Sequence, residues 1–531
     1  MKKSGSENRK NLLSLPAVRN ILLVFFSFLS GSLYAAALPP LNWNIAVFLT
    51  LPVLFYCGIY ARWQLRLLCG WCWGLGWSFF AYSFLREIHP AVPWLLAPVI
   101  SLWPALYTLL AGFWAKRCFG RGSVTGKVTE LPFWAVLRYL AGAAVLFTLI
   151  EWSKYYLFVW NDLSVTLWQL PVLMQIARLT GRYGCTLLIT LTNAAVFALI
   201  FAPKRWLTAG ILLIYPLAAA VYGIMIIRTP ENPADPVEWK CALIQGNLPE
   251  QRIASPAGVI NSIRVYTRLS VKMREYAPQT VIWPECAIPI GLRDEYKLAE
   301  FYRYAVKTLG CQMLIGSLDH TYDGGVTNSA LLISPGGQVA ERYDKFHRVP
   351  FGEYVPFRAW LPESWIEKFD MGRDLSAGKE IYPLNISADI RSGTAVCYEG
   401  VFSYLSAAFA RKGANVLTVL SNDVWYPQSS EPEQHLANAV MRCVETGLPM
   451  IRCGNNGGSG VVNRRGIFTS YIGSPAARPE LLREQAAGIV TVKLERTPGL
   501  TPAVRLENWI VYLLMILLGT GILFPAVPVK K

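Results

Sequence analysis

Long apolar runs dominate the first 227 residues and return at the C-terminus, with a more polar section between them. A transmembrane helix needs about 20 mostly apolar residues. Eight runs approach or exceed that length: 19–38, 44–60, 66–86, 91–114, 133–157, 183–202, 206–227 and 508–527. The pattern predicts an N-terminal membrane domain of about seven transmembrane helices over residues 1–227 and a C-terminal transmembrane helix over 508–527.

The first run allows two interpretations. Basic residues at positions 2, 3, 9 and 10 precede it, and it ends in three alanines at 35–37, which is also the pattern of a cleaved secretory signal. Seven further runs follow, and none of them needs a separate signal. We therefore favour an uncleaved membrane span, with cleavage as the alternative.

Between residues 228 and 507 the pattern changes to short apolar runs that alternate with polar, helix-compatible segments. The short runs are 240–247, 280–285, 311–319, 328–337, 393–399, 414–423, 448–455 and 488–495. The expected helices between them are 259–276, 295–308, 402–412 and 432–447. This alternation predicts one α/β domain over 239–497, preceded by a Pro-rich polar linker at 228–238.

The distribution of positive charge predicts which side of the membrane this domain occupies. Lys and Arg gather before the first run and in every second loop after it, and cytoplasmic loops carry such an excess. Both termini are therefore expected in the cytoplasm and residues 228–507 on the opposite side. The formal net charge of +16 is largely this bias, so we expect no nucleic-acid partner.

Three polar residues of the middle section stand at or just after apolar runs: Glu285, Lys345 and Cys397. Together they suit acyl transfer, because a thiolate attacks a carbonyl, a carboxylate moves the proton and an ammonium stabilises the oxyanion. Pro284 is expected to end its strand, so that Glu285 projects from the strand end. The ordinary alternatives are a structural thiol, a surface glutamate and a solvated lysine, and local sequence alone leaves both interpretations open.

The four histidines do not change this picture. His89, His320, His347 and His435 show no metal-binding spacing, and the chain has no HExxH motif and no glycine-rich phosphate loop. A Cys–His pair is a possible arrangement without specific support. We expect no metal and no cofactor.

Several motifs together carry a resemblance to a known family. They are VIWPE at 281–285, PFGEYVP at 350–356, CYE at 397–399, the Ser421-Asn422-Asp423 stretch with Trp425, the pair Gln434-His435, and RCGNNGGSG at 452–460. In this order they resemble the carbon–nitrogen hydrolase (nitrilase) superfamily and, within it, the apolipoprotein N-acyltransferase family. The resemblance covers nearly the whole chain. It implies an α-helical multi-span membrane domain joined to a nitrilase-like α/β domain, an αββα sandwich.

The resemblance also implies an activity and a location. A fatty acyl chain would pass from a phospholipid to the α-amino group of the lipidated N-terminal cysteine of a diacylglyceryl apolipoprotein. The transfer would proceed through a thioester in a ping-pong sequence. The protein would lie in the bacterial inner membrane, with its catalytic domain in the periplasm. The implied catalytic residues are Cys397 as nucleophile, Glu285 as general base and Lys345 as oxyanion stabiliser. The implied supporting residues are Glu353, Tyr398 and Glu399. We expect a monomer.

Two questions stay open at this stage. Residues 357–369 form a short aromatic-rich amphipathic stretch, expected to be an interfacial arm or, alternatively, an ordinary packed surface helix. The rival functions are a membrane-tethered amidase or thioesterase of the same superfamily, a non-catalytic lipoprotein-binding scaffold and, more weakly, a transporter.

Overall fold

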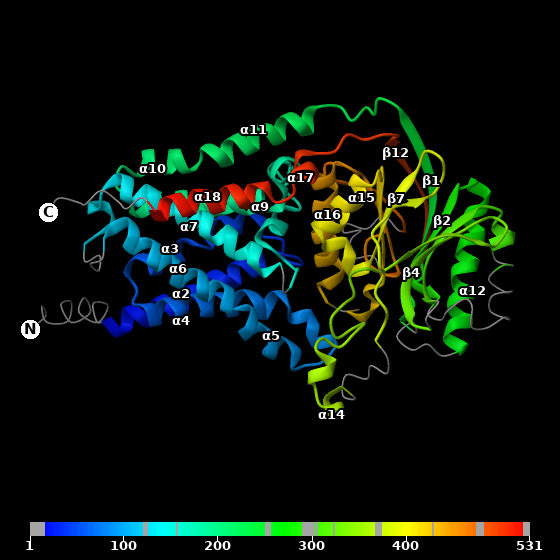
Figure 1. Cartoon of the computed structure of the whole chain (residues 1–531), viewed down its shortest axis with the longest axis horizontal. Coiled ribbons are helices and arrows are strands. Elements are labelled where there is room, and N and C mark those ends of the chain that lie inside the picture. The colour runs from blue at the N-terminus through cyan, green and yellow to red at the C-terminus, as the bar shows by residue number, and fades with distance from the viewer. Residues whose placement is uncertain are drawn as a thin grey trace, which may run out of the picture. The chain divides into compact units, whose positions relative to one another are not determined.

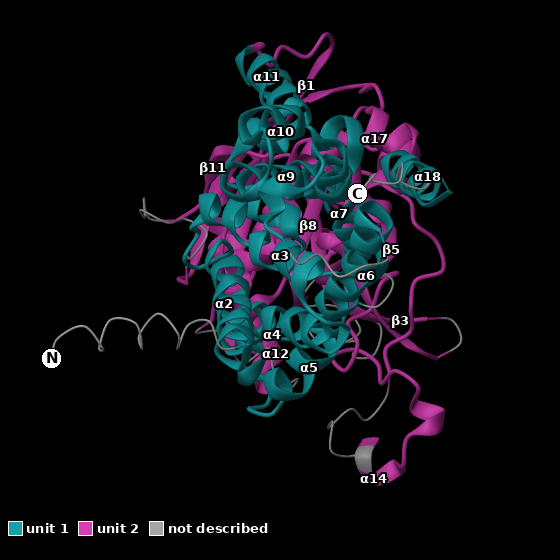
Figure 2. Ribbon diagram, turned by 90° about the vertical axis from the view of Figure 1, so that its left-hand side faces the viewer, with its two compact units in different colours: residues 1–228, 508–531 teal, residues 229–507 magenta. Residues whose placement is uncertain are grey.

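The chain folds into two compact units in the computed structural model, which describes residues 16–120, 126–155, 158–249, 256–288, 303, 306–321, 324–366, 374–426, 429–473 and 483–523. One unit contains Met1–Arg228 and Asn508–Lys531, and the other contains Thr229–Glu507 (Figure 2). The chain thus leaves the first unit after residue 228 and returns to it at residue 508.

The first unit is built from helices (Figure 1). Among its described residues, four helical stretches are long and apolar enough to cross a membrane: α2 (Pro16–Ala36), the consecutive α5 and α6 (Val92–Phe119), α7 (Phe133–Lys154) and α9 (Ala177–Phe201). The pair α10 (Arg205–Leu212) and α11 (Ile214–Arg228) passes the same test together but bends by 46°. These apolar helices fit a multi-pass membrane domain.

The other apolar runs also form helices in this unit. Two are shorter apolar stretches, Asn44–Tyr60 and α18 (Trp509–Leu523). The run predicted at 66–86 forms α4 (Trp63–Ala81) and η2 (Ser83–Glu87). The remaining short elements are η1 (Asn44–Leu49), α3 (Pro52–Tyr60), η3 (Val128–Glu130), η4 (Leu163–Leu167) and α8 (Pro171–Met174). Membrane crossing at 44–60, 66–86 and 508–527 stays a prediction.

A buried charged cluster ties the segment between α7 and α9 into the first unit. Asp162 forms ion pairs with Lys154 at 2.9 Å and with Arg182 at 2.8 Å. Glu151 accepts a hydrogen bond from the backbone N–H of Leu163 at 2.6 Å. Buried charges are tolerated when they are paired in this way. The cluster therefore has a structural explanation, and it gives the transporter interpretation no support.

The second unit is a four-layer sandwich of helices and two sheets (Figure 1). Six described strands form the first sheet in the order β12 (Ala486–Glu495), β1 (Pro236–Gln245), β2 (Thr280–Ile288), β3 (Gln312–His320), β4 (Val326–Ile333) and β5 (Val339–Asp344). Six more form the second sheet in the order β11 (Phe468–Tyr471), β10 (Gly460–Val462), β9 (Met450–Gly454), β8 (Val416–Ser421), β7 (Arg391–Val396) and β6 (Leu384–Asn385). This is the predicted αββα architecture.

Helices cover the outer faces of the two sheets. The first sheet packs against α12 (Pro256–Met273), and the second carries α15 (Ser403–Arg411) and α16 (Glu431–Thr446). Shorter described helices are η6 (Arg274–Tyr276), η7 (Arg358–Trp360), α14 (Glu363–Ile366), η9 (Cys397–Val401), η10 (Asp423–Trp425) and α17 (Pro502–Arg505). The turn η9 follows β7 directly, so the second sheet positions Cys397.

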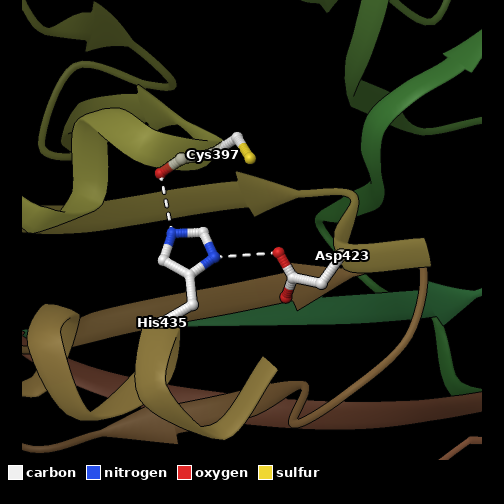
Figure 3. A group of neighbouring side chains, drawn as sticks. All are labelled: Cys397, Asp423 and His435. Carbon is white, nitrogen blue, oxygen red and sulfur yellow. Dashed lines mark hydrogen bonds and ion pairs between the residues drawn. The ribbon is translucent and has the colours of Figure 1, made fainter. Parts of the chain in front are cut away.

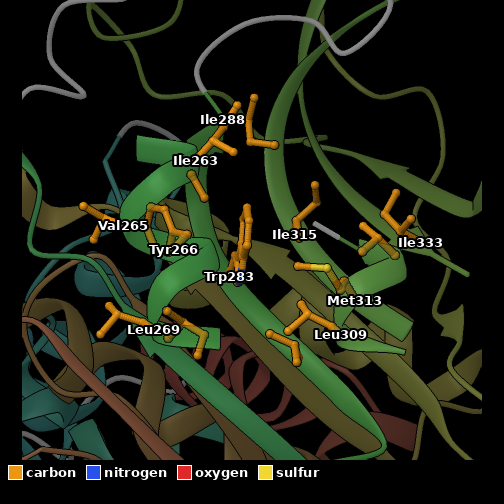
Figure 4. Packing of buried hydrophobic residues seen from close by; sticks show 14 of the residues in the cluster. Ile263, Val265, Tyr266, Leu269, Trp283, Ile288, Leu309, Met313, Ile315 and Ile333 are labelled. Atoms are coloured by element: carbon orange, nitrogen blue, oxygen red, sulfur yellow. The ribbon is translucent and has the colours of Figure 1, made fainter. Parts of the chain in front are cut away.

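A core of large apolar side chains between α12 and the first sheet fixes strand β2 (Figure 4). Trp283 of β2 is fully buried there, stacks on Tyr266 with ring centroids 5.2 Å apart, and donates its indole N–H to Ser270 at 2.9 Å. Burying large aromatic side chains is strongly favourable. The core therefore anchors the strand that carries Glu285.

The structure differs from the sequence predictions in several places. Strand β2 continues through Pro284 to Ile288, so the proline does not end it; instead, the pairing of β2 with β3 becomes irregular between Trp283 and Ile288. A proline lacks the N–H for a regular ladder, and this irregular stretch accommodates it. Strand β1 begins at Pro236, inside the predicted linker. Strands β5, β6, β10 and β11 were not predicted, and most of the expected helix at 295–308 lies outside the described residues.

Candidate active site

Glu285 is buried inside β2, with 5% of its surface exposed. Its Oε1 accepts hydrogen bonds from Asn328 Nδ2 at 2.7 Å and from Lys345 Nζ at 3.2 Å. The neighbouring strand β3 comes very close at this point, since a Cβ on Gly316 would lie 2.4 Å from the Cα of Glu285. Only glycine fits that approach. The irregular backbone of β2 thus turns the carboxylate toward Lys345.

Lys345 follows the last residue of β5 and is 1% exposed. Its Nζ contacts Glu285 at 3.2 Å and Glu353 Oε1 at 2.9 Å. Burial lowers the pKa of this amine, but the carboxylates of Glu353 and Glu285 outweigh burial and hold the pKa well above its ordinary value. Lys345 is therefore charged, and two of the three N–H bonds of its ammonium are accounted for by described residues.

Glu353 and Asn328 complete a closed network around Lys345. Glu353 Oε1 accepts from Lys345 and from Asn328 Nδ2 at 2.9 Å, while its Oε2 accepts from the backbone N–H of Val349 at 2.8 Å. The amide of Asn328, in β4, therefore donates to both glutamates. The sequence did not single out Asn328, which lies between Thr327 and Ser329 in the polar first half of β4.

Cys397 begins the turn η9 immediately after β7, as the sequence indicated for a residue at a strand end. Its φ is +54°, in the left-handed region that non-glycine residues rarely adopt. Its side chain is partly exposed. Burial and the carboxylate of Glu285 raise the pKa of the Cys397 thiol well above its ordinary value, although Lys345 lowers it. The thiol is thus protonated at rest and needs a base before it can attack.

Glu399 connects the turn of Cys397 to the segment around Lys345. Its Oε2 accepts from the N–H of Val396 at 2.8 Å. Its Oε1 accepts from the N–H groups of Phe346 at 2.7 Å and His347 at 3.0 Å, and from the Tyr343 hydroxyl at 2.9 Å. Burial raises the pKa of Glu399 to about 7, while its backbone donors lower it. This side chain therefore fixes the relative positions of the two segments that carry thiol and amine.

Tyr398 packs beside this link through its aromatic ring. Its ring meets Phe402 edge-on at 4.9 Å and His347 at 5.9 Å between centroids. The structure thus gives Tyr398 a packing contact next to the nucleophile. Its supporting role in the reaction stays a prediction.

A second polar cluster includes Cys397 itself (Figure 3). The Cys397 thiol, the Asp423 carboxylate and the His435 imidazole offer atoms that all lie within 4.8 Å of one another, which is also the spacing of a metal site. However, His435 Nδ1 is 2.8 Å from Asp423 Oδ1, and His435 Nε2 is 3.0 Å from the Cys397 carbonyl oxygen. Arg452 pairs with the other oxygen of Asp423. Since these groups already bond one another, a hydrogen-bond network explains the cluster better than metal ligation.

Comparisons with known proteins decide the family. A model described as "Carbon-nitrogen hydrolase" matches residues 240–495, and one described as "Apolipoprotein N-acyltransferase N-terminal domain" matches residues 30–195. The apolipoprotein N-acyltransferase of Geobacter metallireducens is 34% identical over 71% of this chain and 72% of its own length. The chain belongs to the apolipoprotein N-acyltransferase family.

Relatives with this name also match over nearly the full length. The apolipoprotein N-acyltransferase of Ralstonia nicotianae is 28% identical over 95% of this chain and 94% of its own. That of Haemophilus ducreyi is 26% identical over 93% and 94%. Membership therefore covers both units, and the protein is an acyltransferase with a nitrilase-like domain, as the resemblance implied.

Proposed function

We propose that this protein transfers a fatty acyl chain from a membrane phospholipid to the α-amino group of the diacylglyceryl cysteine of an apolipoprotein. The observation that supports this most directly is the contact network of Glu285, Lys345, Glu353 and Asn328 beside a strand-end cysteine. It supplies a base, a cation and a nucleophile within a family of acyltransferases. No step needs a metal or a cofactor.

In the proposed first half-reaction the thiol displaces the lipid alcohol. Glu285 takes the proton from Cys397 Sγ as the sulfur attacks the ester carbonyl, and the third N–H of Lys345 donates to the oxyanion. Collapse of the tetrahedral intermediate breaks the C–O bond. The departing alkoxide recovers the proton from Glu285 and leaves as lysophospholipid. The acyl group is then a thioester on Cys397.

In the proposed second half-reaction the lipoprotein amine attacks the thioester. Glu285 accepts a proton from the amine nitrogen, Lys345 again stabilises the oxyanion, and the C–S bond breaks. The sulfur regains a proton and an amide forms. A ping-pong sequence follows because the lysophospholipid leaves before the lipoprotein amine reacts.

The proposed location is the bacterial inner membrane, with both termini in the cytoplasm and the catalytic domain in the periplasm, as the charge pattern predicts. The proposed arm begins with Phe357 and Trp360, which are 71% and 82% exposed and stack with ring centroids 5.5 Å apart. Exposed aromatic side chains favour the membrane interface. Phe369, also predicted for the arm, lies outside the described residues. We also propose that the protein acts as a monomer.

Intact-protein mass spectrometry in detergent tests this proposal. Wild type and Cys397→Ser are incubated with phospholipid alone, and a hydroxylamine-labile acyl adduct is expected on wild type only. A diacylglyceryl lipopeptide with a free amino terminus is then added, with the N-acetylated peptide as matched control. Only the free amine should discharge the adduct and become an amide.

Other outcomes would favour the rival functions. An adduct that disappears in water at the same rate with either peptide indicates a thioesterase or amidase. If no adduct forms on wild type while lipoprotein still binds, the scaffold interpretation replaces the proposal.

A further inference from the structure

The turn that carries Cys397 is held at both ends by one face of α16. His435 lies 3.0 Å from the carbonyl oxygen of Cys397, and Arg442 donates to the carbonyl oxygen of Val401 at 2.5 Å. These carbonyls belong to the first and last residues of η9. His435 and Arg442 are seven residues apart, two helical turns, so they share a face of α16. The helix thus fixes the turn independently of Glu399.

Both ring nitrogens of His435 face acceptors. Nε2 faces the Cys397 carbonyl and Nδ1 faces the Asp423 carboxylate (Figure 3). Although burial opposes ionisation of Asp423, His435 and Arg452 hold the pKa of Asp423 below its ordinary value. An ionised carboxylate only accepts hydrogen bonds. The ring therefore satisfies both neighbours when both of its nitrogens carry hydrogen, which makes it an imidazolium.

The contact falls where the backbone needs support. Cys397 adopts a left-handed conformation, and such strain persists only where surrounding contacts fix it. Figure 3 shows the carbonyl of Cys397 directed at His435 and the sulfur directed elsewhere. Fixing the carbonyl therefore fixes the backbone of Cys397 and the direction of the Cα–Cβ bond from which its thiol projects. This geometry also argues against a Cys–His pair in which the ring takes the proton of the thiol.

We propose that His435 is a positioning residue for the nucleophile, an imidazolium held by Asp423 that donates to the Cys397 carbonyl and so directs the thiol toward substrate. The inference rests on the proposed function only in taking Cys397 as the nucleophile. Asp423 is itself fixed by Arg452, and Glu431 Oε1 lies 3.9 Å from His435 Nδ1. The positive charge of the ring is therefore paired with the Asp423 carboxylate.

Two substitutions separate the two contacts of the ring. His435→Gln places an amide N–H near the position of Nε2, so it keeps a donor to the Cys397 carbonyl. His435→Asn places its amide near the position of Nδ1, so it keeps only the Asp423 contact. The matched control is Thr446→Val, which removes a buried hydroxyl bonded at 2.7 Å to the Arg442 carbonyl on the same helix, away from Cys397.

Two rates are measured on the full-length proteins in detergent. The first is single-turnover formation of the acyl-enzyme from phospholipid, and the second is alkylation of Cys397 by iodoacetamide, followed by peptide mass spectrometry. In both, we expect His435→Gln and Thr446→Val to stay within about threefold of wild type and His435→Asn to fall at least about tenfold. The KM for phospholipid should not change.

Several results would overturn the inference. The inference fails if His435→Asn reacts at the wild-type rate, or if His435→Gln reacts no faster than His435→Asn. Either result would show that the contact with the Cys397 carbonyl does not control the reactivity of the thiol. If the Asn variant does not fold, alkylation of the Gln variant decides, and a tenfold loss there contradicts the proposal. Because alkylation needs no lipid, it tests the inference even if wild type forms no acyl-enzyme, which would instead reject the proposed function.

Discussion

Asn328 offers the sharpest test of the site, because its amide donates to Glu285 and to Glu353 at once. Asn328→Leu keeps the approximate shape of the side chain and removes both donors. The backbone carbonyl of residue 328 still accepts from the N–H of Lys345 at 2.8 Å, so the strand should continue to place the lysine. The substitution therefore acts on the orientation of the carboxylates.

The size of the effect follows from the hydrogen bonds lost. A hydrogen bond to an ionised group contributes about 1.5–3 kcal/mol. If the bond to Glu285 holds the base in its reactive orientation, its loss slows acylation by about 10- to 150-fold, since 1.4 kcal/mol corresponds to roughly a factor of ten. The simultaneous loss at Glu353 moves the expectation to the upper part of that range, about 100-fold.

The assay is rapid-quench mass spectrometry of acyl-enzyme formation from phospholipid. Ser329→Ala is the matched control, because it removes a buried hydroxyl bonded to Asp344 at 2.6 Å on the opposite face of the same strand. It should cost similar stability and leave the acylation rate within about threefold. A folded Asn328→Leu protein that acylates within threefold of wild type would refute the reasoning.

Three further predictions concern the same domain. Glu353→Gln removes a charge that raises the pKa of Lys345, so single-turnover acylation should fall about tenfold or more, whereas unchanged kinetics would contradict the network. Burial lowers the pKa of His347 from 6.5 to about 4, so the unfolded chain binds a proton at a higher pH than the folded protein does. Between pH 7 and 5 the wild type should therefore lose up to about 2 kcal/mol of stability that His347→Gln does not lose. Thermal unfolding of both proteins checks this, and equal losses would disprove it. Replacing Phe357 and Trp360 with Ser should raise the KM for vesicle phospholipid severalfold without changing alkylation of Cys397, and an unchanged KM would remove the arm from the proposal.

The sequence predicted the parts of the site whose chemistry depends on residue type. A thiol, an amine and two carboxylates with distinctive flanks could be found by reading along the chain, and the structure brings Glu285, Lys345 and Glu353 into direct contact. Their catalytic roles stay predictions. The apolar runs likewise predicted eight of the twelve described strands, because buried strands need continuous apolar sequence.

What the sequence could not predict depends on contacts between distant segments. The role of Asn328 follows from the antiparallel pairing of β4 with β5, which places it beside Lys345. His435 belonged to a recognised motif, but its contact with the Cys397 carbonyl requires α16 to lie across η9. The prediction that Pro284 ends its strand was wrong. A proline ends a strand only where the neighbouring strand needs the missing N–H, and local sequence does not show whether it does.

The charges around Cys397 fit the proposed mechanism, in which a base acts on a neutral thiol and no preformed thiolate is present. Burial, Glu285, Asp423 and Glu431 all raise the pKa of the thiol, and the cation of Lys345 is shared between two carboxylates. The resting sulfur is therefore neutral. In the proposed mechanism, proton transfer to Glu285 becomes favourable only as negative charge develops on a substrate oxygen beside Lys345, so attack and deprotonation are coupled. The proposed coupling would keep a partly exposed cysteine unreactive until an ester carbonyl is in place.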